Sequence, residues 1–71
     1  MIEYEEIIKE RIEYMVNENI SSMEFMIDSS LIYIQESCRY EDAYDVRISN
    51  NYEHREYVIE TNGNVYEERE E

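Results

Sequence analysis

Residues 20–38 constrain the fold most strongly, because they form the one long apolar segment of the chain. Ser21, with Glu24 three residues later, has the spacing of a helix capping box. Apolar residues then recur at spacings of three and four, which indicates a helix. We therefore predict a helix over residues 21–38 at the centre of the core. One of its faces contains Met23, Ile27, Leu31, Ile34 and Cys38.

Phe25 and Ile32 form a second apolar ridge on this predicted helix, nearly opposite the first face. A helix that is apolar on two faces is usually buried on both. The ridge would be covered either by the rest of the monomer or by a second copy of the chain. A homodimer through Phe25 and Ile32 is therefore one of two alternatives that the sequence leaves open.

Residues 2–17 predict an earlier helix, because apolar residues again recur at spacings of three and four. Its apolar face contains Tyr4, Ile8, Ile12 and Met15. The opposite face is an acidic stripe that consists of Glu3, Glu6, Glu10 and Glu13. Ile7 and Tyr14 lie at the edge of this stripe, where they would act as apolar anchors for a partner.

The C-terminal part of the chain predicts three strands, at about residues 43–49, 55–61 and 64–69, because apolar and polar residues alternate. The Asn62-Gly63 dipeptide is a strong signal for a two-residue hairpin turn. That turn pairs Ile59 with Tyr66, and a turn centred on residues 51–52 pairs Val46 with Tyr57. The resulting apolar face contains Tyr44, Val46, Ile48, Tyr57, Ile59 and Tyr66. The other face would carry a row of alternating charge made of Arg47, Glu56 and Arg69.

The expected fold is a single α+β domain over residues 1–71, with two helices packed on a three-stranded antiparallel β-meander (ααβββ). A domain of this size buries only about 60% of the surface of its unfolded chain. Its stability is therefore expected to be low, and a second subunit would increase it.

The chain carries 19 acidic and 6 basic residues, for a formal net charge of −13. This charge would repel nucleic acids and anionic lipids and would attract basic protein surfaces. The lone Cys38 and the lack of a basic leader favour a reducing cytoplasm, which is the host cytoplasm if the protein is phage-encoded. Charged residues within residues 20–38 argue against a membrane span.

The acidic stripe is the main candidate binding site. Carboxylates on adjacent helical turns stand roughly 5 to 6 Å apart, a spacing on the scale of the phosphates of DNA. A second acidic group, made of Glu41, Asp42 and Asp45, would extend this surface. The sequence predicts no catalytic residue, metal site or cofactor. His54 has no local nucleophile signature, and the second acidic group lacks the glycine-containing loop of a calcium site.

We therefore expect a small acidic binding protein, not an enzyme, that inhibits a nucleic-acid-binding protein or nuclease by occupying its basic surface. Its size and charge are similar to those of phage-encoded inhibitors of bacterial defence nucleases, such as anti-CRISPR proteins of the DNA-mimic type. The alternative is a small homo-oligomerising adaptor or regulatory subunit that works through the ridge formed by Phe25 and Ile32.

Overall fold

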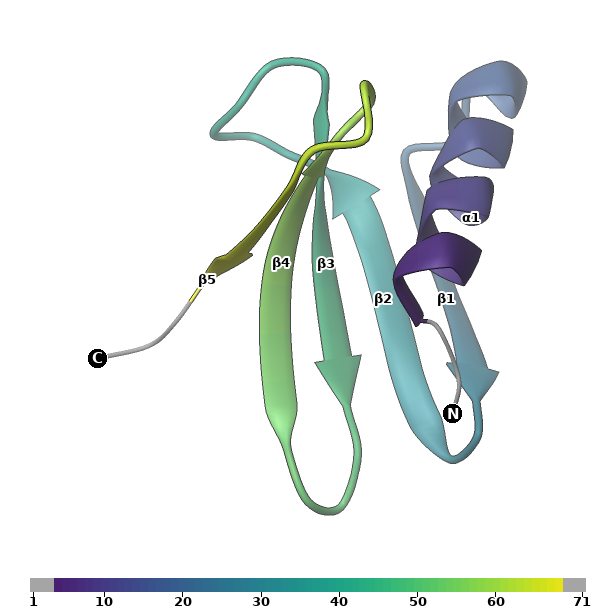
Figure 1. The fold of residues 1–71 in the computed structure, drawn as a ribbon. Coiled ribbons are helices and arrows are strands. Elements are labelled where there is room, and N and C mark those ends of the chain that lie inside the picture. The colour runs from purple at the N-terminus through teal and green to yellow at the C-terminus, as the bar shows by residue number, and fades with distance from the viewer. Residues whose placement is uncertain (1–3, 69–71) are drawn as a thin grey trace.

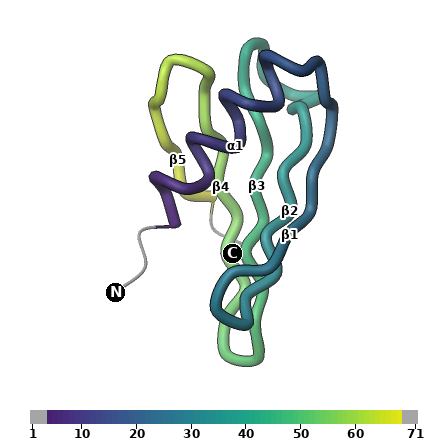
Figure 2. The backbone as a smooth tube through the Cα atoms, turned by 90° about the vertical axis from the view of Figure 1, so that its right-hand side faces the viewer, coloured from purple at the N-terminus to yellow at the C-terminus, as the bar shows by residue number. Residues whose placement is uncertain are grey.

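The computed structural model describes residues 4–68 and contains one helix and a five-stranded antiparallel sheet (Figure 1). The elements are α1 (Tyr4–Glu18), β1 (Ser22–Ile27), β2 (Ser30–Glu36), β3 (Ala43–Ser49), β4 (His54–Glu60) and β5 (Val65–Glu68). Each strand pairs with its neighbours in sequence, so the strand order is β1-β2-β3-β4-β5. Figure 2 shows α1 crossing one face of the sheet diagonally. The predicted fold, two helices on a three-stranded meander, is therefore wrong.

The predicted helix over residues 21–38 is instead the β1–β2 hairpin. Ile27 pairs with Ser30, and the two residues between them, Asp28 and Ser29, have φ angles of 47° and 66°. Two positive φ angles define a type I′ turn, whose twist matches that of paired strands. The segment is also rich in serine and isoleucine, which are weaker helix formers than alanine or leucine, and isoleucine favours strands.

The helix expected over residues 2–17 is observed as α1, and its buried residues are Ile8, Ile12 and Met15. Its end is fixed by a Schellman motif. The Ile20 N–H donates to the Met15 carbonyl at 2.9 Å, and Asn19, which donates to the Val16 carbonyl, has a left-handed φ of 60°. This arrangement turns the chain directly from α1 into β1.

The β3–β4 register is as predicted, since Val46 lies opposite Tyr57. The β4–β5 register is wrong by one residue. Glu60 N–H donates to the Asn64 carbonyl at 2.9 Å, so the loop contains three residues and ends in Gly63, whose φ is 99°. Tyr66 therefore lies opposite Val58 and not Ile59. A slip of one residue reverses the side chain, and Tyr66 is on the exposed face with 54% of its surface accessible.

The core lies between α1 and the sheet face that α1 covers. Its buried residues are Ile8, Ile12, Met15, Ile32, Ile34, Tyr44, Val46, Ile48 and Ile59. Ser30 is the buried polar residue of the described segment, and its hydroxyl contacts the Tyr4 hydroxyl at 3.2 Å and accepts from Asn50 Nδ2 at 3.1 Å. The opposite face, here called the open face, is covered by no helix or strand of residues 4–68. The β2–β3 connection reaches over part of it through Arg39, and Val58 on this face is buried. Within those residues, no helix is long and apolar enough to cross a membrane.

Candidate functional site

The described basic side chains are all engaged by acidic or aromatic neighbours. Four of them form ion pairs: Lys9 with Glu5 at 3.1 Å, Arg39 with Glu68 at 2.6 Å, Arg47 with Glu56 at 3.7 Å, and Arg55 with Glu53 at 3.5 Å. The Arg11 guanidinium lies over the Phe25 ring, 4.7 Å from its centroid. The basic side chains of residues 4–68 therefore form their contacts on the sheet and at the flanks of α1.

The acidic stripe of α1 is left without such neighbours. Glu6, Glu10 and Glu13 are exposed, and helical periodicity places them opposite the buried Ile8 and Ile12. No cation of the described segment lies within ion-pair distance of them. At a rise of about 1.5 Å per residue, successive glutamates of the stripe are about 4.5 to 6 Å apart along the axis. Glu3, the first predicted member, lies outside the described residues.

The second acidic group is only partly assembled. Glu41 and Asp42 are exposed in the β2–β3 connection, and the Asp42 carbonyl accepts the Thr61 N–H at 2.8 Å, which holds the connection against the β4–β5 turn. Asp45 is different, because it is half-buried on the open face of β3 and lies 3.4 Å from Arg39 Nη2. The structure therefore groups Glu41 with Asp42 and separates Asp45 from them.

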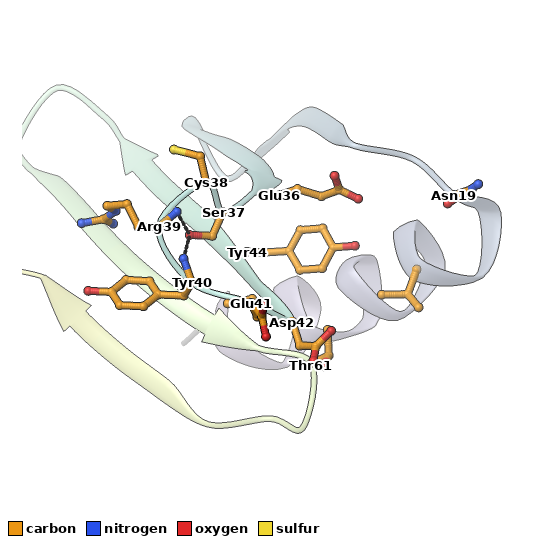
Figure 3. Close-up of a pocket in the computed structure, with 12 residues that line it drawn as sticks. Asn19, Glu36, Ser37, Cys38, Arg39, Tyr40, Glu41, Asp42, Tyr44 and Thr61 are labelled. Atoms are coloured by element: carbon orange, nitrogen blue, oxygen red, sulfur yellow. Dashed lines mark hydrogen bonds between the residues drawn. The ribbon is translucent and has the colours of Figure 1, made fainter.

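An open depression of about 650 Å³ lies beside Glu41 and Asp42 (Figure 3). Val16 and Asn19, at the end of α1, line it together with the β2–β3 connection and Thr61. Glu41 and Asp42 therefore adjoin the C-terminal end of α1, whose last turn contains no basic residue.

Hydrogen bonds within the β2–β3 connection give the depression its shape. The Ser37 hydroxyl accepts the N–H groups of Arg39 and Tyr40 at 3.2 Å each (Figure 3). Tyr44 contributes a buried ring, and burial, with a smaller effect from Glu36, raises the pKa of its hydroxyl. That hydroxyl therefore stays neutral in the physiological range. Cys38, predicted on an apolar helical face, is instead an exposed residue of this connection.

The two predicted anchors lie on a flank of α1 and not within the acidic stripe. Ile7 is four residues before Arg11 and Tyr14 three residues after it, so all three share one side of the helix. Arg11 contacts Phe25 of β1, which places this flank on the β1 side. Ile7 is half-buried, and Tyr14 is 51% exposed.

The predicted ridge of Phe25 and Ile32 does not exist as a helical surface. The two residues are directly opposite each other in the β1–β2 pair, on the face that α1 covers. Ile32 has 0% of its surface exposed, and Phe25 is half-buried beneath Arg11. Ile32 is therefore a core residue, whereas Phe25 lies at the edge of the sheet.

The open face contains contacts that sequence reasoning missed. Cross-strand pairing forms one row across the sheet: Glu24, Tyr33, Arg47, Glu56 and Glu68. The Arg47–Glu56 pair was predicted, but Glu68 occupies the third position, and Arg69 lies outside the described residues. Arg39 reaches this row from the β2–β3 connection and donates to both Glu68 carboxylate oxygens, at 2.8 and 2.6 Å. This bond raises the pKa of Arg39 and lowers that of Glu68.

His54 has one neighbour that its sequence context did not indicate. The Ser49 hydroxyl lies 3.2 Å from His54 Nδ1, because Ser49 and His54 are directly opposite in β3 and β4. The contact is a cross-strand pair at the end of the open face. Within residues 4–68, no three or more His, Cys, Asp or Glu side chains are grouped so as to hold a metal ion.

Comparison of the chain with protein-family models, curated proteins and solved structures found no match.

Proposed function

We propose that this protein is a small acidic binding protein that occupies the basic, nucleic-acid-binding surface of a partner and inhibits it. One observation carries the proposal. Glu6, Glu10 and Glu13 are exposed on the outer face of α1, and the described basic residues are engaged elsewhere. The stripe is therefore available to lysine and arginine side chains of another protein.

The mechanism is competition for a phosphate-binding surface. Because α1 is packed on the sheet through Ile8, Ile12 and Met15, the backbone positions of its glutamates are held in a row, as phosphates are along a nucleic-acid strand. Glu41 and Asp42, beyond the C-terminal end of α1, extend the negative surface. Net charge of −13 would accelerate association with a basic surface, and added salt would slow it.

The test begins with the full chain as bait in a nuclease-treated bacterial lysate, where proteins bound through nucleic acid are lost. Captured proteins are eluted with salt, identified and assayed for binding to duplex DNA and to RNA, with the bait as competitor. Nucleases of bacterial defence systems are the first class to assay. We expect the bait to displace nucleic acid from at least one captured protein.

Charge-neutralising variants then locate the surface. The triple variant Glu6→Gln, Glu10→Gln, Glu13→Gln removes three exposed charges at about 0.7 kcal/mol each, or about 2 kcal/mol and about 30-fold in inhibition constant. The control triple variant Glu24→Gln, Asp28→Asn, Glu53→Gln removes the same charge from exposed positions on β1 and in two turns.

The comparison of the two triple variants decides the proposal. Inhibition that is weakened by the α1 triple variant and kept by the control supports it. Equal inhibition by both variants would show that the acidic stripe is a solvated helix face. Captured proteins that bind no nucleic acid would overturn the proposed competition for a phosphate-binding surface.

A further inference from the structure

β1 is an edge strand without the usual protection against pairing with another strand. It has six residues, of which only Glu24 is charged, and it contains no proline. Natural edge strands are commonly short, charged, interrupted by proline or covered. β5, at the opposite edge, is protected in this way, because it has four residues that include Glu67 and Glu68. Figure 2 shows β1 along the side of the sheet away from β5.

The hairpin geometry determines which backbone groups of β1 are free. Ile27 and Ser30 flank a two-residue turn and so exchange hydrogen bonds, and every second residue of β1 does the same with β2. The Ser21 carbonyl, which accepts the Glu36 N–H at 2.9 Å, continues this alternation. The N–H and C=O groups of Ser22, Glu24 and Met26 therefore point outward from the sheet.

Apolar side chains gather around this edge. Phe25 is half-buried on the face that α1 covers, and Met26, on the open face, is 63% exposed. Above Phe25 lies the flank of α1 that carries Ile7 and Tyr14, because Arg11 on the same flank covers Phe25. A strand added to β1 would therefore form backbone hydrogen bonds and also cover apolar surface from both layers.

We propose that β1 pairs antiparallel with β1 of a second copy of this chain, which joins the two sheets into one and places both helices on the same face. A two-fold axis normal to the sheet brings together residues that share a face. With the axis at Phe25, Met23 lies opposite the partner's Ile27 and Glu24 opposite the partner's Met26. The outward groups of Glu24 and Met26 then bond across the axis, and the two Phe25 rings form the close, non-hydrogen-bonded pair.

The charge near this edge favours pairing with a second copy of the chain over pairing with a basic segment of another protein. Residues 20–27 contain one acidic residue, Glu24, and the adjoining flank of α1 contributes the positive charge of Arg11. The edge is therefore close to neutral, and the Phe25-centred register keeps the two Glu24 side chains from facing each other. A basic partner would instead be drawn to the acidic stripe.

The charge of the whole molecule predicts how dimerisation responds to salt. Two chains of formal charge −13 repel each other, and salt screens this repulsion. Dimerisation should therefore strengthen as salt is raised, whereas binding of a basic partner should weaken. Salt therefore changes dimerisation and partner binding in opposite directions. A chain that does not dimerise can be told apart from a chain that does not bind a basic partner.

Sedimentation equilibrium of the full chain, from low salt to about 0.5 M NaCl, measures the oligomeric state. We expect a dimer fraction that rises with salt. Met26→Pro removes one outward N–H without touching the β1–β2 ladder and should give a monomer. Met26→Thr, which keeps that N–H, is the matched control and should still dimerise. A wild-type chain that stays monomeric in high salt at high micromolar concentration would overturn the proposal.

Cysteine crosslinking tests the register independently, in a Cys38→Ser background. Phe25→Cys places two thiols in directly opposite positions, at a Cα separation of about 4.5 Å that a disulfide can span. Met23→Cys is the control, because Met23 lies opposite Ile27 and its copies are far apart. We expect rapid covalent dimerisation of F25C and none of M23C. Equal crosslinking of both variants, or dimerisation that survives Met26→Pro, would show that a different surface is used.

Discussion

Replacing Ser29 with glycine is expected to stabilise the protein, although the same change in a helix would weaken it. Ser29 is exposed and has a left-handed φ of 66° as the second residue of the β1–β2 turn. A side chain in that region costs roughly 1 to 2 kcal/mol. Glycine removes this cost, and its greater freedom in the unfolded chain takes back roughly 0.5 to 1 kcal/mol. The net gain is therefore between about 0 and 1.5 kcal/mol, with a centre at about 0.75 kcal/mol.

Thermal unfolding followed by circular dichroism measures this gain. For a domain of this length, 1 kcal/mol corresponds to a change in Tm of about 4 to 8 °C, so Ser29→Gly should raise the Tm by several degrees. Ser22→Gly is the matched control, because Ser22 is exposed in β1 without a positive φ. That change should lower stability by about 0.5 to 1 kcal/mol. A lower Tm for Ser29→Gly would refute the cost assigned to the left-handed φ of Ser29 in this turn.

Two further predictions concern the core and the open face. Ile32→Ala should reduce the free energy of unfolding by about 3 to 4 kcal/mol, because Ile32 is fully buried. Urea titration measures this loss. A loss below about 1 kcal/mol would contradict the position of Ile32 in the core. Glu68→Gln should lower the Tm at neutral pH, because the hydrogen bond from Arg39 lowers the pKa of Glu68 and so stabilises the fold while that carboxylate is ionised. This contribution is lost as pH falls through the lowered pKa, so the two Tm values should converge in acid, below the ordinary pKa range of a glutamate. A difference that stays constant through this acid range would contradict the ion pair.

α1 was predictable because its apolar residues fit only the helical period. The hairpin in residues 20–38 was not predictable, because the apolar residues of this segment fit both a helix and two strands. The deciding feature is the turn at Asp28 and Ser29, which adopts two left-handed residues without the glycine that usually marks it. The predicted helix also needed two apolar faces, whereas the hairpin places Met23, Phe25 and Ile32 on a single face.

The candidate site also has a part that was predictable from the sequence and a part that was not. The stripe of Glu6, Glu10 and Glu13 follows from local helical spacing and was therefore predictable. The position of Asp45 was not, because it depends on Arg39, which also bonds Glu68 at a separation of 29 residues. Tyr66 was assigned to the wrong face because the Asn62-Gly63 signal locates the turn but does not show that the loop has three residues.

The order of the strands also has a consequence for folding kinetics. Every sheet pairing joins strands that are consecutive in the chain, so each closes only a short loop. Low contact order is associated with fast folding. A chain with this much like charge would gain from such a route, because each hairpin can form before distant acidic segments approach one another. We therefore expect rapid folding in which the sheet grows by neighbouring hairpins and α1 docks on the apolar face that they create.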